Sequence, residues 1–559
     1  MSRAGWAFFA LSMLLARGSG QEEKPVNVPS PRALLRRSGG TTAVIGNYIY
    51  YDGGELSEEG FTSSVRRTNG MNATISIDLS RSWSPSDVEM KETTKPPTPL
   101  NRQALLKDPS GDAFYIWGGA LVGGTRLTDP TLWKFTVDGS GGGSWSEEPD
   151  ISNRPFFEQL DRVQGAATVS TSSRGFIIGG SSDKSTAPEP KSRIVGHVAL
   201  DFDDRTWSQE DQAPYSSTGA LFGGRAVHVP GYGQDGIVML LGGGHDAARQ
   251  YVDFGTVYLF DFEAGTWHRQ ETTGPKPSGR ALHCITGVAG NGTYEIFLYG
   301  GEIRNSGRSY SDMYALSLPG FRWTRLAPEK SPPARRDHAC ETVGKRQMLS
   351  WGGLDSSDGS SMWENGDAFP QSIGIFDMAT LQWTDRYDAD AEEYETHESI
   401  RSWYDEGGMS TVNWTSTEVE TLFASMTSST PTGEPSSGGG GGGSEASGDG
   451  SVSTGAIAGA VVGGVGGLAI VGGLLWYLLR RRRREKAAAS PATTTAYTPA
   501  GTQEYYPQQK AYNPEADKYP QYGGELDGHS PRPEMQGDPA RVEAAATSLP
   551  VEMPDTSRR

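Results

Sequence analysis

Residues with the capacity for chemistry stand together at two places in the chain. His283 directly precedes Cys284, and His338 precedes Cys340 by two residues. Thiolates and imidazoles are ligands for zinc and copper, whereas two cysteines without a metal can form one disulfide. Because these are the only cysteines and no C-x-x-C spacing occurs, the sequence predicts neither a structural zinc site nor a disulfide-stapled scaffold.

The elements that position these residues are indicated by an internal repeat. A pair of glycines closes an apolar stretch six times, with a tryptophan after each pair and an arginine 16 to 20 residues before it. The pairs are Gly53-Gly54, Gly118-Gly119, Gly179-Gly180, Gly242-Gly243, Gly300-Gly301 and Gly352-Gly353. The tryptophans are Trp83, Trp145, Trp207, Trp267, Trp323 and Trp383. The arginines are Arg37, Arg102, Arg162, Arg225, Arg280 and Arg335.

Each repeat predicts four short strands. The first follows the arginine, the second ends at the glycine pair, and the fourth carries the tryptophan. Glycines suit a strand end that needs a positive φ, and a tryptophan can pack one repeat against the next. Four strands repeated around an axis form the blades of a propeller. The predicted fold class is therefore an all-β, six-bladed propeller over residues 32–386.

The phased glycine pairs and tryptophans resemble the kelch repeat family of β-propellers. No Trp-Asp closes the repeats, so the Trp-Asp repeat family is disfavoured. The chain also resembles the single-pass kelch membrane proteins of filamentous fungi, some of them cell-wall-anchored, through residues 345–353 and 370–377. This closer resemblance implies a fold and a location, and it implies no molecular activity.

The kelch resemblance brings one enzymatic alternative, because some secreted kelch propellers are copper radical oxidases similar to galactose oxidase. Such a site needs a cysteine cross-linked to a tyrosine, a second tyrosine and two histidines on the axis. We find no such set, and we predict no catalytic, cofactor-binding or metal-binding residue. An oxidoreductase or another carbohydrate-active enzyme on the same fold stays as the alternative.

The histidines and cysteines have a structural interpretation within the propeller. His228, His283 and His338 take similar places after the repeat arginine, and such positions are spread around the axis instead of converging to zinc bonds of about 2.1 Å. The offsets of Cys284 and Cys340 from their histidines differ by one, so strand alternation points them to opposite blade faces. We expect a disulfide between blades five and six.

Two apolar segments predict the topology. Residues 6–16 follow Arg3 and precede small residues, which is typical of a cleavable signal peptide over residues 1–20. Residues 456–479 carry no charge, are long enough to cross a bilayer and precede five arginines, which predicts a transmembrane helix with a cytoplasmic tail. Glycines at every fourth position, Gly455 to Gly467, offer a face for homodimerisation within that helix.

The remaining segments complete a type I protein at the plasma membrane or cell surface. We expect residues 387–409 to close or cap the propeller, residues 410–455 to form a Ser/Thr/Gly-rich stalk, and residues 480–559 to be a disordered tail. Asn72, Asn291 and Asn413 begin N-glycosylation motifs on the predicted exterior.

Composition and architecture together favour a non-catalytic binding module. The net charge of -18 disfavours nucleic acid as a partner. Loops at one mouth of a propeller carry binding sites, and the longer loops here are residues 121–130, 181–191, 244–253 and 354–369. The expected partners are surface proteins or cell-wall glycans, and a structural tether between wall and membrane is a further alternative.

Overall fold

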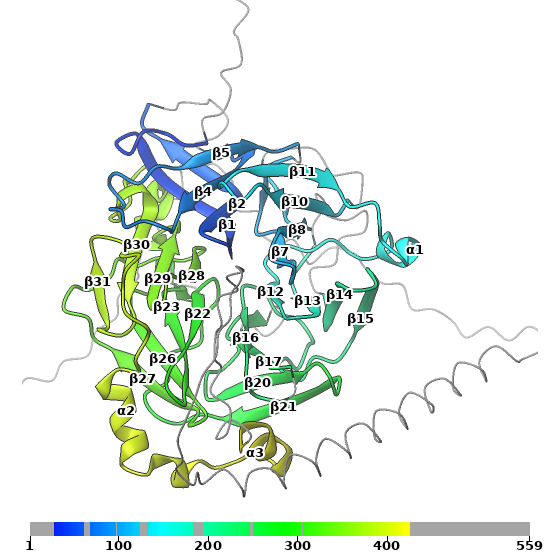
Figure 1. The fold of residues 1–559 in the computed structure, drawn as a ribbon, viewed down its shortest axis with the longest axis vertical. Helices are drawn as coiled ribbons and strands as arrows, with labels where there is room; N and C mark the ends of the chain where they lie inside the picture. Colours follow the sequence, from blue (N-terminus) through cyan, green and yellow to red (C-terminus); the bar gives the residue numbers. More distant parts are fainter. Residues whose placement is uncertain are drawn as a thin grey trace, which may run out of the picture. The chain divides into compact units, whose positions relative to one another are not determined.

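The structure, a computed structural model, describes residues 27–60, 68–96, 98–122, 131–182, 194–233, 235–245, 250–303 and 306–424. Six antiparallel sheets of four main strands each are arranged around one axis (Figure 1). The predicted six-bladed all-β propeller is therefore confirmed. Each blade uses consecutive strands, and its first strand lies nearest the axis.

The blades follow one another in chain order. Blade one is β1 (Leu34–Ile45), β2 (Tyr48–Glu58), β4 (Ala73–Asp78) and β5 (Lys91–Thr94), with β3 (Asn69–Gly70) paired to β2. Blade two is β7 (Ala104–Lys107), β8 (Ala113–Trp117), β10 (Trp133–Val137) and β11 (Gly143–Glu147). Blade three is β12 (Ala167–Ser170), β13 (Arg174–Ile178), β14 (His197–Asp201) and β15 (Trp207–Glu210). Blade four is β16 (Arg225–Val229), β17 (Ile237–Leu241), β20 (Thr256–Asp261) and β21 (Thr266–Glu271).

Blades five and six repeat the pattern. Blade five is β22 (Cys284–Ala289), β23 (Tyr294–Tyr299), β26 (Met313–Leu318) and β27 (Arg322–Leu326). Blade six is β28 (Ala339–Val343), β29 (Gln347–Trp351), β30 (Ile373–Asp377) and β31 (Gln382–Thr384). Short pairs are β6 (Leu100–Asn101) with β9 (Ala120–Leu121), β18 (Gly244–His245) with β19 (Gln250–Tyr251), and β24 (Glu302–Ile303) with β25 (Arg308–Ser309). The helices are α1 (Arg154–Phe157), α2 (Glu398–Asp405), α3 (Thr417–Ala424) and the 3-10 turns η1 (Ser356–Ser361), η2 (Pro370–Ser372) and η3 (Gly408–Thr411).

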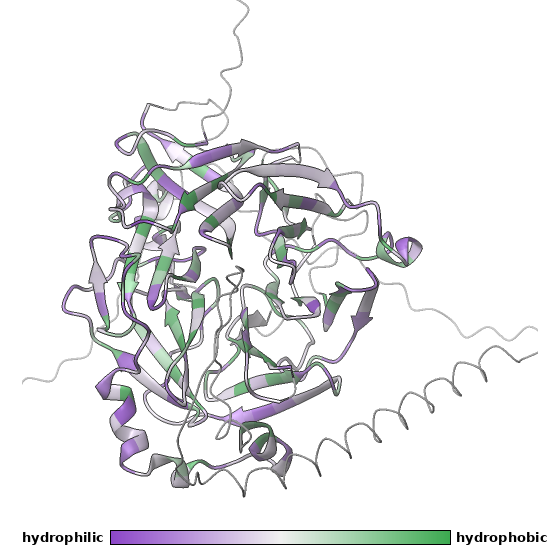
Figure 2. Cartoon of the chain, in the orientation of Figure 1, coloured by the Kyte–Doolittle hydropathy of each residue, from purple (hydrophilic) through white to green (hydrophobic). Residues whose placement is uncertain are grey.

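Hydrophobic burial lies between the blades instead of in one central core. The buried apolar residues fall into six clusters, and each joins two neighbouring blades, the last blade with the first included. Second strands such as β17 are buried along their whole length, because a neighbouring blade covers each face of the sheet. Figure 2 shows the contrast between apolar middle strands and the more hydrophilic outer strands β15 and β21.

A closed ring of backbone hydrogen bonds surrounds one end of the axis. At one position in each blade the N–H donates to the carbonyl of the equivalent residue in the preceding blade, over distances of 2.7 to 3.2 Å. All six residues have positive φ, between 54° and 75°. They are Gly39, Arg102, Gly165, Gly223, Leu282 and Asp337, one from each blade in order. The ring fixes the radius of the central channel at this end.

The glycine pairs tie each blade to the next. The N–H of Gly353 donates to the carbonyl of Arg37 at 2.6 Å, which links blade six to blade one. The N–H groups of Gly119, Gly180, Gly243 and Gly301 bond the following blade in the same way. All six pairs have positive φ at both glycines, which explains why the repeat needs glycine there.

The six repeat arginines do not occupy equivalent positions relative to the backbone ring. Arg37, Arg280 and Arg335 stand two residues before the ring position and are buried. Arg335 donates to the carbonyl of Gly352 at 2.5 Å and pairs with Asp367 at 2.8 Å. Arg102 is itself a ring residue. Arg162 stands three residues before the ring residue of its blade, Gly165, and Arg225 stands two residues after the ring residue of its blade, Gly223. The prediction of six equivalent arginines is thus wrong for these three, whose blades carry Leu100, Val163 and Leu221 at the equivalent place.

The tryptophans occupy fourth strands in blades two to six but not in blade one. Trp207 packs on Trp117 of the preceding blade with ring centroids 5.6 Å apart, and Trp383 packs on Tyr299 at 5.2 Å. Trp83 lies before β5 and bridges to Tyr387, which follows blade six. The expectation that Trp83 sits on a fourth strand is wrong, because this tryptophan instead seals the junction between the last and first blades.

The segment after blade six packs on the outside of the propeller (Figure 1). Ile400 of α2 is buried in the cluster between blades five and six. Val419 and Phe423 of α3 are buried in the cluster between blades four and five. The boundary placed at residue 410 for a flexible stalk is therefore wrong, since residues up to 424 contact the blades.

The other topology predictions lie outside the described residues. These are the signal peptide at 1–20, the rest of the stalk to residue 455, the transmembrane helix at 456–479 with its glycine face, and the tail at 480–559. Among the described residues, no helix combines the length and apolar character needed to span a membrane.

Candidate functional site

A central pocket of about 570 Å³ lies among the innermost strands of the propeller. All six blades contribute to its wall through β1, β7, β12, β16, β22 and β28. Threonines and alanines make up much of the lining, so the charged side chains that reach the pocket stand out against a mostly small and neutral wall. The charged residues are Arg102, Lys107, Arg225, Asp337 and Glu341.

The loops predicted to carry binding begin at the ring end of the channel. The residue just before the ring position forms an isolated antiparallel β-bridge with the residue just after the glycine pair. Examples are Phe222 with Gly244 and Arg336 with Leu354. The loop over residues 354–369 is described, and its Asp358 and Asp367 lie 3.2 and 3.9 Å from Arg36. Residues 123–130, 183–193 and 246–249 of the other loops lie outside the described part of the chain.

An ion pair crosses the ring end of the pocket. Arg102 of blade two donates to both carboxylate oxygens of Asp337 in blade six, at distances of 2.7 to 3.1 Å. Gly39 of blade one joins the same two residues through the backbone, since its N–H donates to the Asp337 carbonyl and its carbonyl accepts from the Arg102 N–H. Burial alone would raise the pKa of Asp337, but the Arg102 guanidinium holds it below its ordinary value.

Arg225 lies beside that ion pair with few partners of its own. Within the described residues its guanidinium donates one hydrogen bond, to the carbonyl of the adjacent Gly224 at 3.2 Å. Burial lowers the pKa of Arg225; Asp337 acts against this change, and the like charge of Arg102 adds to it. A guanidinium has five N–H donors, so most of those on Arg225 are available to a ligand in the pocket.

The opposite end of the wall carries a second pair of charged residues. Glu341 of β28 accepts a hydrogen bond from the Thr42 hydroxyl at 3.3 Å. Burial raises the pKa of Glu341 to about 7, although the positive charge of Lys107 and the Thr42 hydroxyl act in the opposite direction. The pocket therefore presents permanent positive charge near the ring and a titrating carboxyl further along.

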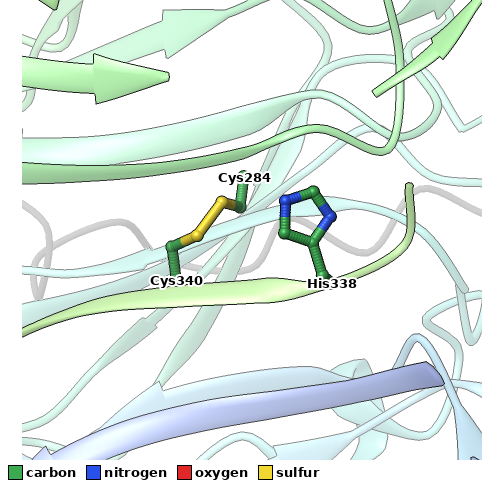
Figure 3. Close-up of side chains that lie close together, drawn as sticks. All are labelled: Cys284, His338 and Cys340. Carbon is green, nitrogen blue, oxygen red and sulfur yellow. A yellow bond between two sulfur atoms is a disulfide. The ribbon is translucent and has the colours of Figure 1, made fainter. Parts of the chain in front are cut away.

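The two cysteines meet in the wall between blades five and six (Figure 3). Cys284 of β22 and Cys340 of β28 form a disulfide with their Cα atoms 5.5 Å apart. The imidazole of His338 lies alongside, and one ring nitrogen is within 4.8 Å of both sulfur atoms. The three side chains are buried, with exposed fractions of 1% for Cys284, 9% for Cys340 and 1% for His338.

The histidines predicted to share one position do not all share it. His283 and His338 each follow the ring residue directly, whereas His228 stands five residues after it and bonds the Asp235 carbonyl at 2.9 Å. Burial, followed by nearby arginines, lowers the pKa of His283 and of His338 well below the usual value. Burial therefore disfavours the charged form of both imidazoles. Among the described residues no hydrogen bond of ordinary geometry reaches either ring.

The three glycosylation motifs differ in accessibility. Asn291, in the β22–β23 hairpin, and Asn413, before α3, are exposed. Asn72 is only half-exposed, and its side-chain oxygen accepts a hydrogen bond of 2.7 Å from Asn27.

The cysteines could be located from the sequence, whereas the pocket residues Arg225 and Glu341 could not be recognised as a group. The distance of Arg225 from a glycine pair matches that of the repeat arginines, but its side chain lines the pocket. Glu341 stands one residue after Cys340 on an inner strand otherwise lined by small residues. A charged residue at a channel-facing position is the signal that would have identified it.

Comparisons with known proteins agree with the propeller. The chain is 25% identical over 407 residues to a kelch repeat-containing protein of Arthroderma benhamiae, covering 64% of this chain and 58% of that protein. It is 25% identical over 153 residues to kelch domain-containing protein 3 of Homo sapiens, covering 27% of this chain and 37% of that protein. The chain thus spans little more than half, or less, of the length of these relatives.

A solved structure and a protein family complete the comparison. The structure of YjhT aligns with a TM-score of 0.43 and 13% identity, covering 63% of this chain and 98% of that one. Residues 39–301 and 232–412 match the KLHDC2/KLHL20/DRC7 Kelch-repeats domain. Together these two ranges include strands of all six blades and most of the segment after them. This protein belongs to the kelch-repeat family.

Proposed function

We propose that this protein is a type I membrane protein of the cell surface whose external kelch propeller is a non-catalytic binding module. Kelch propellers commonly bind proteins, and the proposed partners here are surface proteins or cell-wall glycans. The support for the location is the apolar segment at residues 6–16 and the uncharged segment at 456–479 followed by arginines.

The observation that carries the proposal is the central pocket with Arg225 at its ring end. Arg102 is neutralised by Asp337, whereas Arg225 makes one hydrogen bond, to its neighbour Gly224, within the described residues. A carboxylate can satisfy a guanidinium through two parallel hydrogen bonds. The favoured ligand is therefore an acidic group, carried either by a side chain of a partner protein or by a uronic acid of a glycan.

The experiment is equilibrium binding of the full-length protein to a panel of immobilised probes. The panel contains neutral β-glucan and chitin oligosaccharides, polyuronides, and glutamate-rich and lysine-rich peptides, with bound copper measured in the same sample. Saturable binding to polyuronide or to glutamate-rich peptide, with neither copper nor lysine-rich peptide bound, is the expected result. Absence of binding to every acidic probe would contradict the proposed ligand class.

The same experiment separates the two alternatives. A copper radical oxidase needs a free cysteine to cross-link to a tyrosine, and here both cysteines are engaged with each other. Stoichiometric copper on the oxidised protein, in which the disulfide is intact, would nevertheless return the assignment to an oxidoreductase. For a structural tether, removal of residues 480–559 leaves the cellular phenotype unchanged, whereas a receptor that signals through its tail loses it.

A further inference from the structure

The wall between blades five and six holds three potential metal ligands around one point. These are the sulfur atoms of Cys284 and Cys340 and a ring nitrogen of His338, all within 4.8 Å of one another. Two thiolates with one imidazole form a soft donor set of the kind that Zn²⁺ and Cu⁺ prefer. The residues come from β22, from β28 and from the residue just before β28, so two blades share the site.

His338 gives a second, independent observation that points to a ligand. Its side chain is only 1% exposed, and apart from a backbone contact with Tyr299 of imperfect hydrogen-bond geometry, its ring nitrogens have no polar partner among the described residues. A buried polar group without a partner costs about 1 to 3 kcal/mol, so native structures rarely keep one without a reason. A bound cation would satisfy one of these nitrogens.

Access favours the same interpretation. Cys284, His338 and Cys340 all line the central pocket, so an ion can reach them from the channel and a water molecule can take a fourth position.

We propose that reduction of the Cys284–Cys340 disulfide creates a binding site for a soft cation such as Zn²⁺, with both sulfur atoms and His338 as ligands. A dithiol reductant supplies two electrons and two protons, becomes a disulfide itself and leaves two cysteine thiols. Zn²⁺ then displaces both thiol protons. The sulfur atoms must separate to about 3.8 Å, the span of two 2.3 Å bonds at a tetrahedral angle. The Cα separation of 5.5 Å is that of two strands already side by side.

The test compares oxidised and dithiol-reduced full-length protein after exchange into Zn²⁺ or Co²⁺ buffer. The metal content is measured by mass spectrometry, and a thiolate-to-cobalt charge-transfer band reports sulfur ligation. We expect one metal per reduced chain and none per oxidised chain. His338→Gln lowers the affinity at least about tenfold, as does Cys284→Ser.

The matched control is His283→Gln. His283 follows the ring residue of blade five as His338 follows that of blade six, and it is equally buried, but it is not part of the three-ligand group. Its substitution therefore leaves the metal affinity within about twofold of the reduced wild type. Equal metal content in the oxidised and reduced wild type would overturn the proposal, as would unaltered affinity in His338→Gln. Loss of the near-ultraviolet circular dichroism on reduction would also overturn it, because the site requires a folded reduced state.

Discussion

The backbone N–H of Gly39 in blade one donates a 3.2 Å hydrogen bond to the carbonyl of Asp337 in blade six. This bond closes the ring that runs through all six blades. Blade one and blade six each consist of consecutive strands, so the two ends of the propeller segment share no blade. Closure therefore depends on this ring, on the Gly353–Arg37 backbone bond and on the contact of Trp83 with Tyr387.

Substitution of Gly54 tests the need for glycine at a position of positive φ within the second strand of blade one. Gly54 has a φ of +81°, and a Cβ there would clash with the Ser38 carbonyl and lie 2.6 Å from the Gly40 nitrogen. Gly54→Ala should therefore cost about 2 to 4 kcal/mol in the free energy of unfolding, measured by urea titration. The control is Gly46→Ala, whose φ of +56° leaves open space around the Cβ and which should cost only about 1 kcal/mol. Equal costs would show that backbone crowding at Gly54 is unimportant.

The disulfide should contribute measurably to stability. It joins residues 56 positions apart, and loop-closure entropy predicts a stabilisation of about 4 kcal/mol. The double variant Cys284→Ala, Cys340→Ala should lose about that much, and a reductant should shift the unfolding midpoint of the wild type but not of the variant. Peptide maps with and without reduction show whether the bridge exists in the isolated protein, and two free thiols would contradict it.

Much of the fold could be predicted because its strongest signals are backbone requirements. A glycine pair marks the second strand of each blade, since both glycines have positive φ and the surrounding atoms leave no room for a Cβ. The arginine pattern was less reliable, because Arg102 and Arg225 fall at suitable distances without occupying the buried position of Arg335. Spacing alone does not distinguish a framework arginine from one that faces the channel.

The candidate site was harder to predict than the fold. The pairing of Cys284 with Cys340 follows from strand alternation, a local rule. The meeting of Arg225 with the Arg102–Asp337 pair depends on three blades that converge at the ring, which no local pattern encodes. The packing of α3 was missed for a similar reason, since Val419 and Phe423 lie in a segment rich in Ser and Thr.

Glu341 should make stability depend on pH. Its pKa is raised to about 7 in the folded protein, above the ordinary value of 4.5, so its contribution is complete below pH 4.5 and is lost as the pH rises through 7. Glu341→Gln should leave stability at pH 4.5 nearly unchanged and raise it by about 1 to 3 kcal/mol at pH 8. Urea titrations at the two pH values measure this difference. Exposed Glu329 provides the control, because Glu329→Gln should have the same small effect at both.

The glycosylation motifs should be used unequally. Asn291 and Asn413 are exposed, whereas the side-chain oxygen of Asn72 accepts a hydrogen bond from Asn27. Intact-mass analysis of the protein secreted by a eukaryotic host should therefore find glycans at the first two sites and not at Asn72. Asn27→Ala should make Asn72 a better acceptor. A fully occupied Asn72 in the wild type would show that the Asn27 contact forms only after modification or not at all.

The most direct test of the binding module compares two arginines of blade four. Arg225 reaches the central pocket from β16, whereas Arg269 is exposed on the outer strand β21. Binding of full-length protein to polyuronide and to glutamate-rich peptide is measured for the wild type, Arg225→Gln and Arg269→Gln. Loss of a charge-assisted hydrogen bond should weaken binding by about ten- to a hundredfold in Arg225→Gln and leave it unchanged in Arg269→Gln. Equal affinity in all three proteins would contradict a ligand site in the central pocket.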